Sequence, residues 1–89
     1  MEFPEDIVKD CRMRLHRIKG QIDGIEKMLM EKRDCKDIIT QISAANKALE
    51  QVGFHLLASG MSYCLDNPSG AAEDGYDLED IKKMFLKLS

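Results

Sequence analysis

Two cysteines in this sequence combine a reactive residue type with a suggestive spacing. Cys35 stands among three bases and two acids, Lys32, Arg33, Asp34, Lys36 and Asp37, and Cys64 follows 29 residues later, just before Asn67 and Pro68. If one helix joins them, Cys35 lies at its N-terminus, where the helix dipole and nearby cations favour a thiolate. Cys64 then lies at the opposite end, where the dipole disfavours one. The pattern predicts Cys35 as the attacking thiol and Cys64 as its receiving partner.

Helix geometry keeps these two thiols apart within one chain. Twenty-nine steps of about 100° return to within roughly 20° of the starting direction, but at 1.5 Å per residue they also span about 44 Å. A disulfide requires Cα atoms about 5.5 Å apart. Two copies packed antiparallel would place Cys35 of one chain near Cys64 of the other, twice by symmetry. The alternative is that both are small buried apolar residues, as we expect for Cys11, which lies on an apolar stripe.

A metal ion would need more ligands than these two thiolates. One helical turn before Cys64 the chain has Gly60 and Met61, and Gly60 offers no side chain. His55 lies about 180° around the helix from Cys64, and His16 belongs to a basic run, so we expect both as surface or DNA-facing groups. Because Cu(I) accepts thiolate and thioether ligands, Met61 or Cys11 keeps a copper site open as a disfavoured alternative.

The elements that carry these residues are predicted to be helices, since both prolines, Pro4 and Pro68, fall outside the long apolar repeats. A first long helix follows Pro4. A second begins near Cys35, with Asp34 as its N-cap, and ends before a turn cluster at 67–70. A third, short and peripheral, fits 78–88. The two long stripes step by three and four residues, at Ile7, Cys11, Leu15, Ile18, Ile22, Ile25 and Leu29, then at Ile38, Ile42, Ala45, Leu49, Val52 and Leu56.

Length and composition allow one all-α domain over residues 1–89. Hydrophobic residues make up 44% of the chain, with only three Phe and two Tyr. A chain this short leaves apolar surface uncovered, so we expect oligomers. No apolar run approaches the roughly 18 residues of a membrane span, and the N-terminus resembles no signal peptide, which predicts a cytoplasmic protein.

Charge is unevenly distributed although the net charge is only −3. Residues 9–19 hold five bases and one acid, whereas residues 66–80 hold six acids and no base. The basic run is either a solvated helix face or a DNA-binding patch multiplied by symmetry. An enzyme is not expected, because no histidine is placed beside a cysteine, and neither paired carboxylates nor a phosphate-binding glycine loop is present.

Three features together resemble the CsoR/RcnR family of bacterial all-helical repressors. They are RLHRIKGQIDGIEKML at 14–29, DCKDIITQISAANKAL at 34–49, and the later Cys64. The resemblance covers nearly the whole chain. It implies an antiparallel four-helix-bundle dimer, pairing into a disc-like tetramer, that binds operator double-stranded DNA. It also implies that DNA is released when an inducer occupies a site between subunits.

The same resemblance bears on the inducer. Copper sensors of the family carry cysteines at the positions of Cys35 and Cys64 and a histidine at the position of Gly60. The nickel/cobalt and formaldehyde sensors also use that histidine, which this sequence lacks. Two cysteines without it are similar to the CstR branch, whose members form sulfur bridges between subunits in response to persulfides and polysulfides.

For DNA contacts, the resemblance points most clearly to Arg14, with Arg17, Lys19 and Lys47 as further candidates. Gln51 stands where an arginine is common in the family.

We therefore expect a repressor that senses reactive sulfur through Cys35 and Cys64 and needs no cofactor. The alternative is a Cu(I) sensor that uses Cys35, Cys64 and Met61. A third reading is a structural helical module with inert cysteines.

Overall fold

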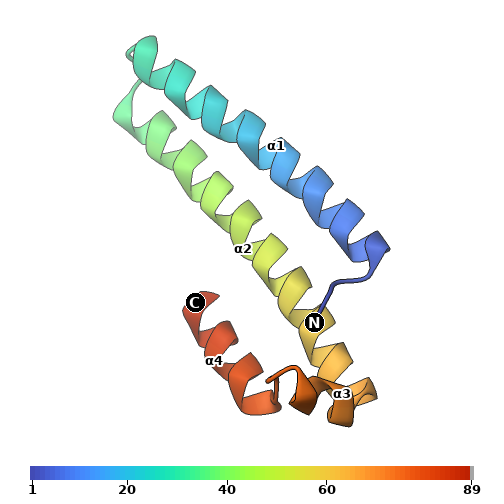
Figure 1. Ribbon diagram of the computed structural model, residues 1–89. Helices are drawn as coiled ribbons and strands as arrows, with labels where there is room; N and C mark the ends of the chain where they lie inside the picture. Colours follow the sequence, from blue (N-terminus) through green and yellow to red (C-terminus); the bar gives the residue numbers. More distant parts are fainter. Residues whose placement is uncertain (89) are drawn as a thin grey trace.

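The computed structural model describes residues 1–88 and contains four α-helices in that range. They are α1 (Glu5–Met30), α2 (Cys35–Asp66), α3 (Pro68–Glu73) and α4 (Leu78–Leu88). Helices α1 and α2 form a long antiparallel hairpin, and α4 folds back along the C-terminal half of α2 (Figure 1). The predicted all-α fold with two long helices is confirmed. Within residues 1–88, no helix is long and apolar enough to cross a membrane.

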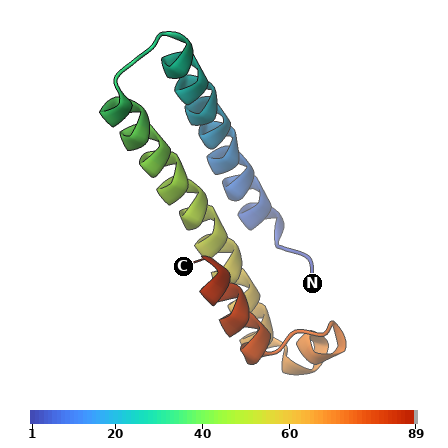
Figure 2. The ribbon, with the colours of Figure 1, turned by 90° about the vertical axis from the view of Figure 1, so that its left-hand side faces the viewer.

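Helix α2 is the element that all the others contact. It packs against α1 on one side and against α3 and α4 near its C-terminus. Figure 2 shows α4 lying along α2, and α1 running beside α2 with the opposite chain direction. A single chain is therefore elongated, with principal extents of 54, 25 and 14 Å.

The connection from α1 to α2 sets where Cys35 begins its helix. The backbone N–H of Arg33 donates to the Met28 carbonyl at 2.9 Å, and that of Lys32 donates to the Leu29 carbonyl at 3.2 Å. This pair of bonds is a Schellman motif, and Lys32 occupies its left-handed position with φ +56°. The Asp34 carboxylate then accepts from the Lys36 N–H at 3.1 Å, which confirms the predicted N-cap.

The chain after α2 differs from the prediction. The turn expected at 67–70 is instead the start of an additional short helix, α3. Asn67 caps this helix by accepting from the Gly70 N–H at 3.3 Å, and Pro68 occupies its first position. Asparagine followed by proline is a helix-start signal as well as a turn signal. Helix α4 has the predicted bounds, and reciprocal bonds between Asp77 and Asp80, at 2.8 and 3.2 Å, form its capping box.

Two separate buried clusters hold the helices together. The first joins α1 to α2 through Cys11, Ile18 and Val52. Cys11 is only 4% exposed, as expected for a core cysteine. The second, which we call the cap cluster, consists of Cys64, Ala71 and Ile81 and joins α2 to α3 and α4.

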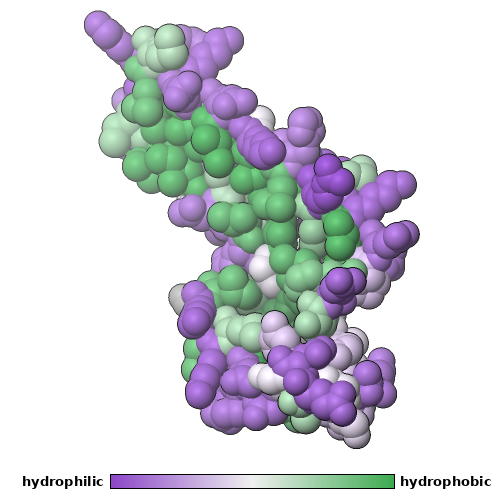
Figure 3. All heavy atoms as spheres, viewed as in Figure 1, coloured by the Kyte–Doolittle hydropathy of each residue, from purple (hydrophilic) through white to green (hydrophobic). Residues whose placement is uncertain are grey.

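A single chain leaves much of its two long apolar stripes uncovered. Figure 3 shows apolar side chains gathered over the hairpin of α1 and α2. The exposed members of the stripes are Leu15, Ile22, Leu29, Ile42 and Leu49, and Ile39 widens the patch on α2. Exposed apolar surface of this extent marks an interface. The antiparallel dimer and the tetramer stay predictions.

Candidate sensing thiols and DNA-binding surface

Cys35 is the first residue of α2, and its side chain is exposed. Its neighbours are charged: the Asp34 carboxylate caps the helix, and Arg33 pairs with Asp37 at 3.8 Å. The structure thus places Cys35 where the sequence predicted, at the N-terminus of the second long helix, and shows it exposed there.

Cys64 lies in the last turn of α2, at the other end from Cys35, and its surroundings are opposite in character. It is only 7% exposed, and it packs in the cap cluster against Ala71 of α3 and Ile81 of α4. Both thiols are free. The sequence predicted the position of Cys64 but not its cover, which comes from helices that follow it in the chain.

The position one turn before Cys64 faces α4. Gly60 is buried, and a Cβ built on it would lie 3.4 Å from Cδ1 of Ile81 and 4.0 Å from Sδ of Met1. An alanine would fit in ordinary van der Waals contact, but an imidazole at this position would meet both side chains. Met61, the proposed thioether donor, is 45% exposed. In one protomer, no three His, Cys, Asp or Glu side chains within residues 1–88 gather as a metal-ion site.

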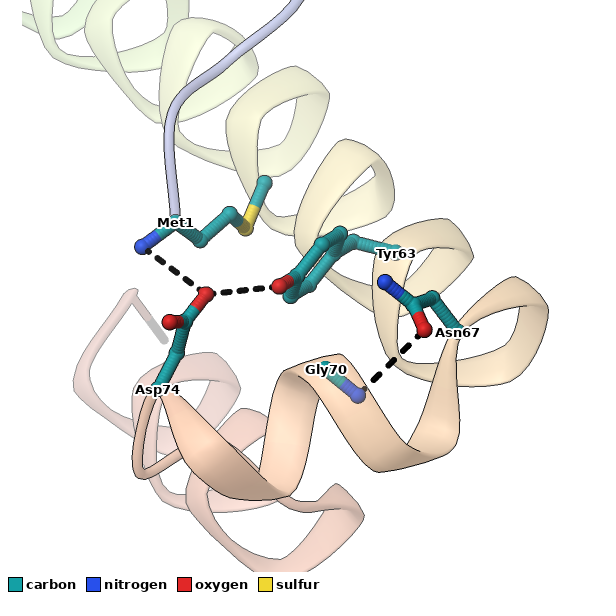
Figure 4. A network of polar contacts seen from close by, with 5 residues as sticks. All are labelled: Met1, Tyr63, Asn67, Gly70 and Asp74. Atoms are coloured by element: carbon teal, nitrogen blue, oxygen red, sulfur yellow. Dashed lines mark hydrogen bonds and ion pairs between the residues drawn. The ribbon is translucent and has the colours of Figure 1, made fainter.

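A polar network fastens the end of α3 beside Cys64 (Figure 4). The Tyr63 hydroxyl donates to Oδ2 of Asp74 at 2.6 Å, and the amino group of Met1 pairs with the same oxygen at 3.5 Å. The hydrogen bond from Tyr63, helped by the nearby amino group, lowers the pKa of Asp74. The same bond raises the pKa of Tyr63. The network ties α2, α3 and the N-terminal segment together, and the sequence alone gave no sign of it because its members are far apart in the chain.

An apolar cavity of about 350 Å³ lies between α2, α4 and the N-terminal segment. Phe3, Leu56, Gly60, Ile81 and Met84 are among its lining residues. Since Ile81 also belongs to the cap cluster, this solvent-open pocket borders the side chains that cover Cys64.

On α1, Arg14 is held by an acid that sequence reasoning passed over. Its Nε donates to Oδ2 of Asp10 at 2.9 Å. This hydrogen bond is the main reason that the pKa of Asp10 is lowered, with smaller contributions from the charges of Arg14, His55 and Arg17. Bonding through Nε leaves the terminal guanidinium nitrogens available for a phosphate. The four-residue spacing of Asp10 and Arg14 is the signal that identifies such pairs.

The other proposed DNA contacts are exposed, but they do not all share a face. At about 100° per residue, Arg17 lies about 60° around α1 from Arg14, whereas Lys19 lies about 140° away. Lys47 lies on α2 and is also exposed. Within residues 1–88, no ion pair engages Arg17, Lys19 or Lys47. The structure therefore groups Arg14 with Arg17 and places Lys19 on another side of α1.

Comparison with known proteins places this chain among repressors. The family model described as "Metal-sensitive transcriptional repressor" matches residues 8–87. The copper-sensing transcriptional repressor CsoR of Bacillus subtilis (strain 168) is 40% identical over 77 residues, which cover 83% of this chain and 76% of that protein. The copper-sensing transcriptional repressor RicR of Mycobacterium tuberculosis (strain ATCC 25618 / H37Rv) is 39% identical over 64 residues, 72% of this chain and 67% of that protein.

A solved structure agrees with the sequence matches. The crystal structure of the copper-sensing repressor CsoR with Cu(I) from Geobacillus thermodenitrificans NG80-2 superposes with a TM-score of 0.73 and 32% identity. The alignment covers 94% of this chain and 84% of that one. These relatives are named as copper sensors, so they support the family but not the finer resemblance to its persulfide-sensing branch. The chain belongs to the CsoR family of metal-sensitive transcriptional repressors.

Proposed function

We propose that this repressor binds operator DNA in its reduced form and releases it when a persulfide or polysulfide joins Cys35 of one protomer to Cys64 of another. The observation that carries the proposal is the donor set. Two free thiols lie at the two ends of α2, and a glycine, Gly60, stands one turn before the second. Two thiols are enough for a sulfur bridge, whereas a protein metal site is usually completed by further ligands.

The bridge must form between chains. At 1.5 Å per residue, the thiols of one α2 are about 44 Å apart, which no sulfur chain of a few atoms spans. The uncovered apolar side chains of α1 and α2 call for a second copy. If the two α2 helices pack antiparallel, each Cys35 comes near a Cys64 of the other protomer.

The chemistry balances in two steps with a low-molecular-weight persulfide, RS–SH. The thiolate of Cys35 attacks the sulfane sulfur, forms Cys35–S–SH and releases RS⁻. The thiolate of Cys64 from the other protomer then attacks Sγ of Cys35 and displaces hydrosulfide. Two thiols are oxidised to a disulfide, and the sulfane sulfur is reduced to sulfide. A polysulfide donor leaves additional sulfur atoms in the bridge, and cellular thiols reduce it.

A bridge between opposite ends of two α2 helices constrains how the two hairpins sit against each other. Arg14 and Arg17 are carried by α1, which packs on α2 through Cys11, Ile18 and Val52. A change in the arrangement of the hairpins therefore moves these cations relative to the spacing of the DNA phosphates. Because phosphate contacts set both affinity and register, such a shift weakens operator binding.

A second candidate inducer is Cu(I), and the relatives favour it because they are named copper sensors. The residues present fit a soft cation in part: Cys35 and Cys64 are thiols, and Met61 adds a thioether one turn from Cys64. When bound, Cu(I) would be held by the thiols of Cys35 and Cys64 and would act as a soft metal centre that favours sulfur ligands. In the copper sensors that this sequence resembles, a histidine stands at the position of Gly60. The third ligand here would therefore be Met61, which is exposed.

One anaerobic experiment separates the two inducers. The reduced protein is bound to an operator fragment selected from the genome, and then treated either with glutathione persulfide or with Cu(I) buffered by a strong chelator. We expect the persulfide to release the DNA and buffered Cu(I) to leave it bound. If buffered Cu(I) released the DNA and the persulfide did not, the result would contradict sulfur sensing and establish Cu(I) as the inducer. Cys11→Ala is the matched control, because it removes a thiol from the other buried cluster.

A further inference from the structure

The protomer buries one of the two proposed sensing thiols under its own C-terminal segment. Cys64 is 7% exposed, and its neighbours Ala71 and Ile81, at 2% and 3%, come from α3 and α4. Cys35 is exposed. Within one protomer the two thiols therefore differ sharply in solvent exposure, although both take part in the proposed bridge.

The cover over Cys64, residues 68–88, is held by a small set of identifiable interactions. Asp74, which ends α3, joins Tyr63 of α2 to the amino group of Met1 (Figure 4). These polar groups lie at the surface, so the network is modest in strength and exposed to competing water. We call this network the latch.

Helix α4 is seated on two glycines of α2. A Cβ on Gly53 would lie 2.6 Å from Cδ2 of Leu88, and one on Gly60 would lie 3.4 Å from Cδ1 of Ile81. A side chain at Gly53 would collide with the end of the Leu88 side chain, so a glycine there lets α4 lie close to α2, whereas an alanine at Gly60 would fit in ordinary contact with Ile81. Between them lies the apolar cavity of about 350 Å³. This pocket is open to solvent, so α4 has few apolar contacts with α2 there, and an element with few such contacts opens at low cost.

We propose that α3 and α4 form a hinged cover that controls access of the inducer to Cys64. This inference rests on the proposed role of Cys64 in inducer capture. Cys35 takes up the inducer first, and the second bond forms only when the cover opens. The order of the two steps is then a property of the fold.

The three cysteines allow a direct test with a neutral alkylating probe, N-ethylmaleimide, on the reduced full-length protein without DNA. Peptide mass spectrometry gives the alkylation rate of each thiol in the same sample. Cys35 reports the reactivity of an open thiol, Cys64 reports opening of the cover, and Cys11 reports opening of the whole hairpin. We expect Cys64 to react at least about tenfold more slowly than Cys35.

Two variants change the cover in different ways. Ile81→Ala removes the side chain over Cys64, and Tyr63→Phe removes only the hydroxyl of the latch. We expect both to speed alkylation of Cys64 by about threefold or more while the rates of Cys35 and Cys11 stay unchanged. Leu78→Ala, on an exposed residue of the same helix, is the matched control and should leave all three rates unchanged.

Specific results would overturn the inference. Equal rates for Cys64 and Cys35 in the unchanged protein would show that no cover operates. The same conclusion follows if neither variant changes the rate of Cys64. If Ile81→Ala also exposes Cys11, the hairpin itself has opened, and Tyr63→Phe then decides. Failure of the proposed function is distinguished separately, by inducer-driven DNA release that persists in Cys64→Ala.

Discussion

Cys35 and Cys64 begin and end the same helix, yet one is exposed and the other lies beneath α3 and α4. In the proposed sulfur-sensing mechanism, this asymmetry gives the two cysteines different roles. The exposed thiol at the helix N-terminus is suited to attack, and the covered thiol is suited to receive the second bond.

The first prediction concerns Cys35. Cys35→Ala should bind operator DNA as tightly as the unchanged protein but should no longer release it on treatment with glutathione persulfide, because the attacking thiolate is gone. Fluorescence anisotropy of a labelled operator measures both properties. Release from this variant at the normal persulfide concentration would show that another thiol starts the reaction.

The second prediction concerns Arg14. Arg14→Ala should weaken operator binding by about tenfold or more, since it removes a charge-assisted hydrogen bond to phosphate. It should also reduce the slope of log affinity against log salt by about one for each phosphate that the variant no longer neutralises. Size-exclusion chromatography should show unchanged assembly. Unchanged affinity with normal assembly would remove Arg14 from the DNA-binding surface, and Lys27→Ala, far along α1, is the matched control.

The third prediction concerns the Asp10 carboxylate that holds Arg14. The pKa of Asp10 lies below its ordinary value of 3.8, mainly because of the hydrogen bond from Arg14. A lowered pKa in the folded state favours folding above the unfolded pKa, and this contribution is lost as the pH falls through the folded pKa. Carboxyl-carbon NMR should show the pKa of Asp10 rising toward 3.8 in Arg14→Ala. A titration unchanged by that substitution would mean that the pair does not persist in solution.

The ion pair between Asp10 and Arg14 also predicts a change in DNA affinity that is opposite in sign to the change expected from charge alone. Asp10→Asn removes a negative charge from the basic run, which by itself strengthens attraction to DNA. If Asp10 orients Arg14, affinity should instead fall. Asp6→Asn, one turn earlier on α1, removes the same charge without touching Arg14 and should leave affinity equal or higher. A rise in affinity for both variants would show that Asp10 acts only through its charge.

The fifth prediction concerns the loop that positions Cys35. Lys32 adopts a left-handed conformation that costs a non-glycine residue about 1–2 kcal/mol. Lys32→Gly removes that cost. It also increases the conformational entropy of the unfolded chain, which lowers the stability by about 0.4–1 kcal/mol. We expect a net stabilisation of about 0.5–1 kcal/mol in urea unfolding at fixed protein concentration. Lys27→Gly, inside α1, should instead destabilise by about 1 kcal/mol, and a loss of stability in both variants would contradict the loop geometry.

Much of the fold follows from local patterns in the sequence. The apolar stripes, Asp34 as a cap and the acids that begin α4 predict the two long helices and the last short one, and the structure confirms them. The family match confirms a repressor, not an enzyme. Helix α3 was not predicted, because Asn67 and Pro68 signal a turn and a helix start equally well.

The candidate site was only half predictable. The position of Cys35 at the start of a helix depends on its neighbours in the chain, so the sequence predicts it. The burial of Cys64 depends on Ala71 and Ile81, which follow it by 7 and 17 residues and reach it only through the packing of α3 and α4. Local pattern carries no information on such tertiary packing.

The most direct test of sulfur sensing is the intact mass of the protein after treatment with glutathione persulfide under nonreducing conditions, with operator affinity measured on the same sample. We predict a covalent dimer of two 10.1 kDa chains, joined through Cys35 and Cys64 in peptide maps, with DNA affinity falling in proportion to its formation. DNA release from protein that remains entirely monomeric in mass would contradict the account.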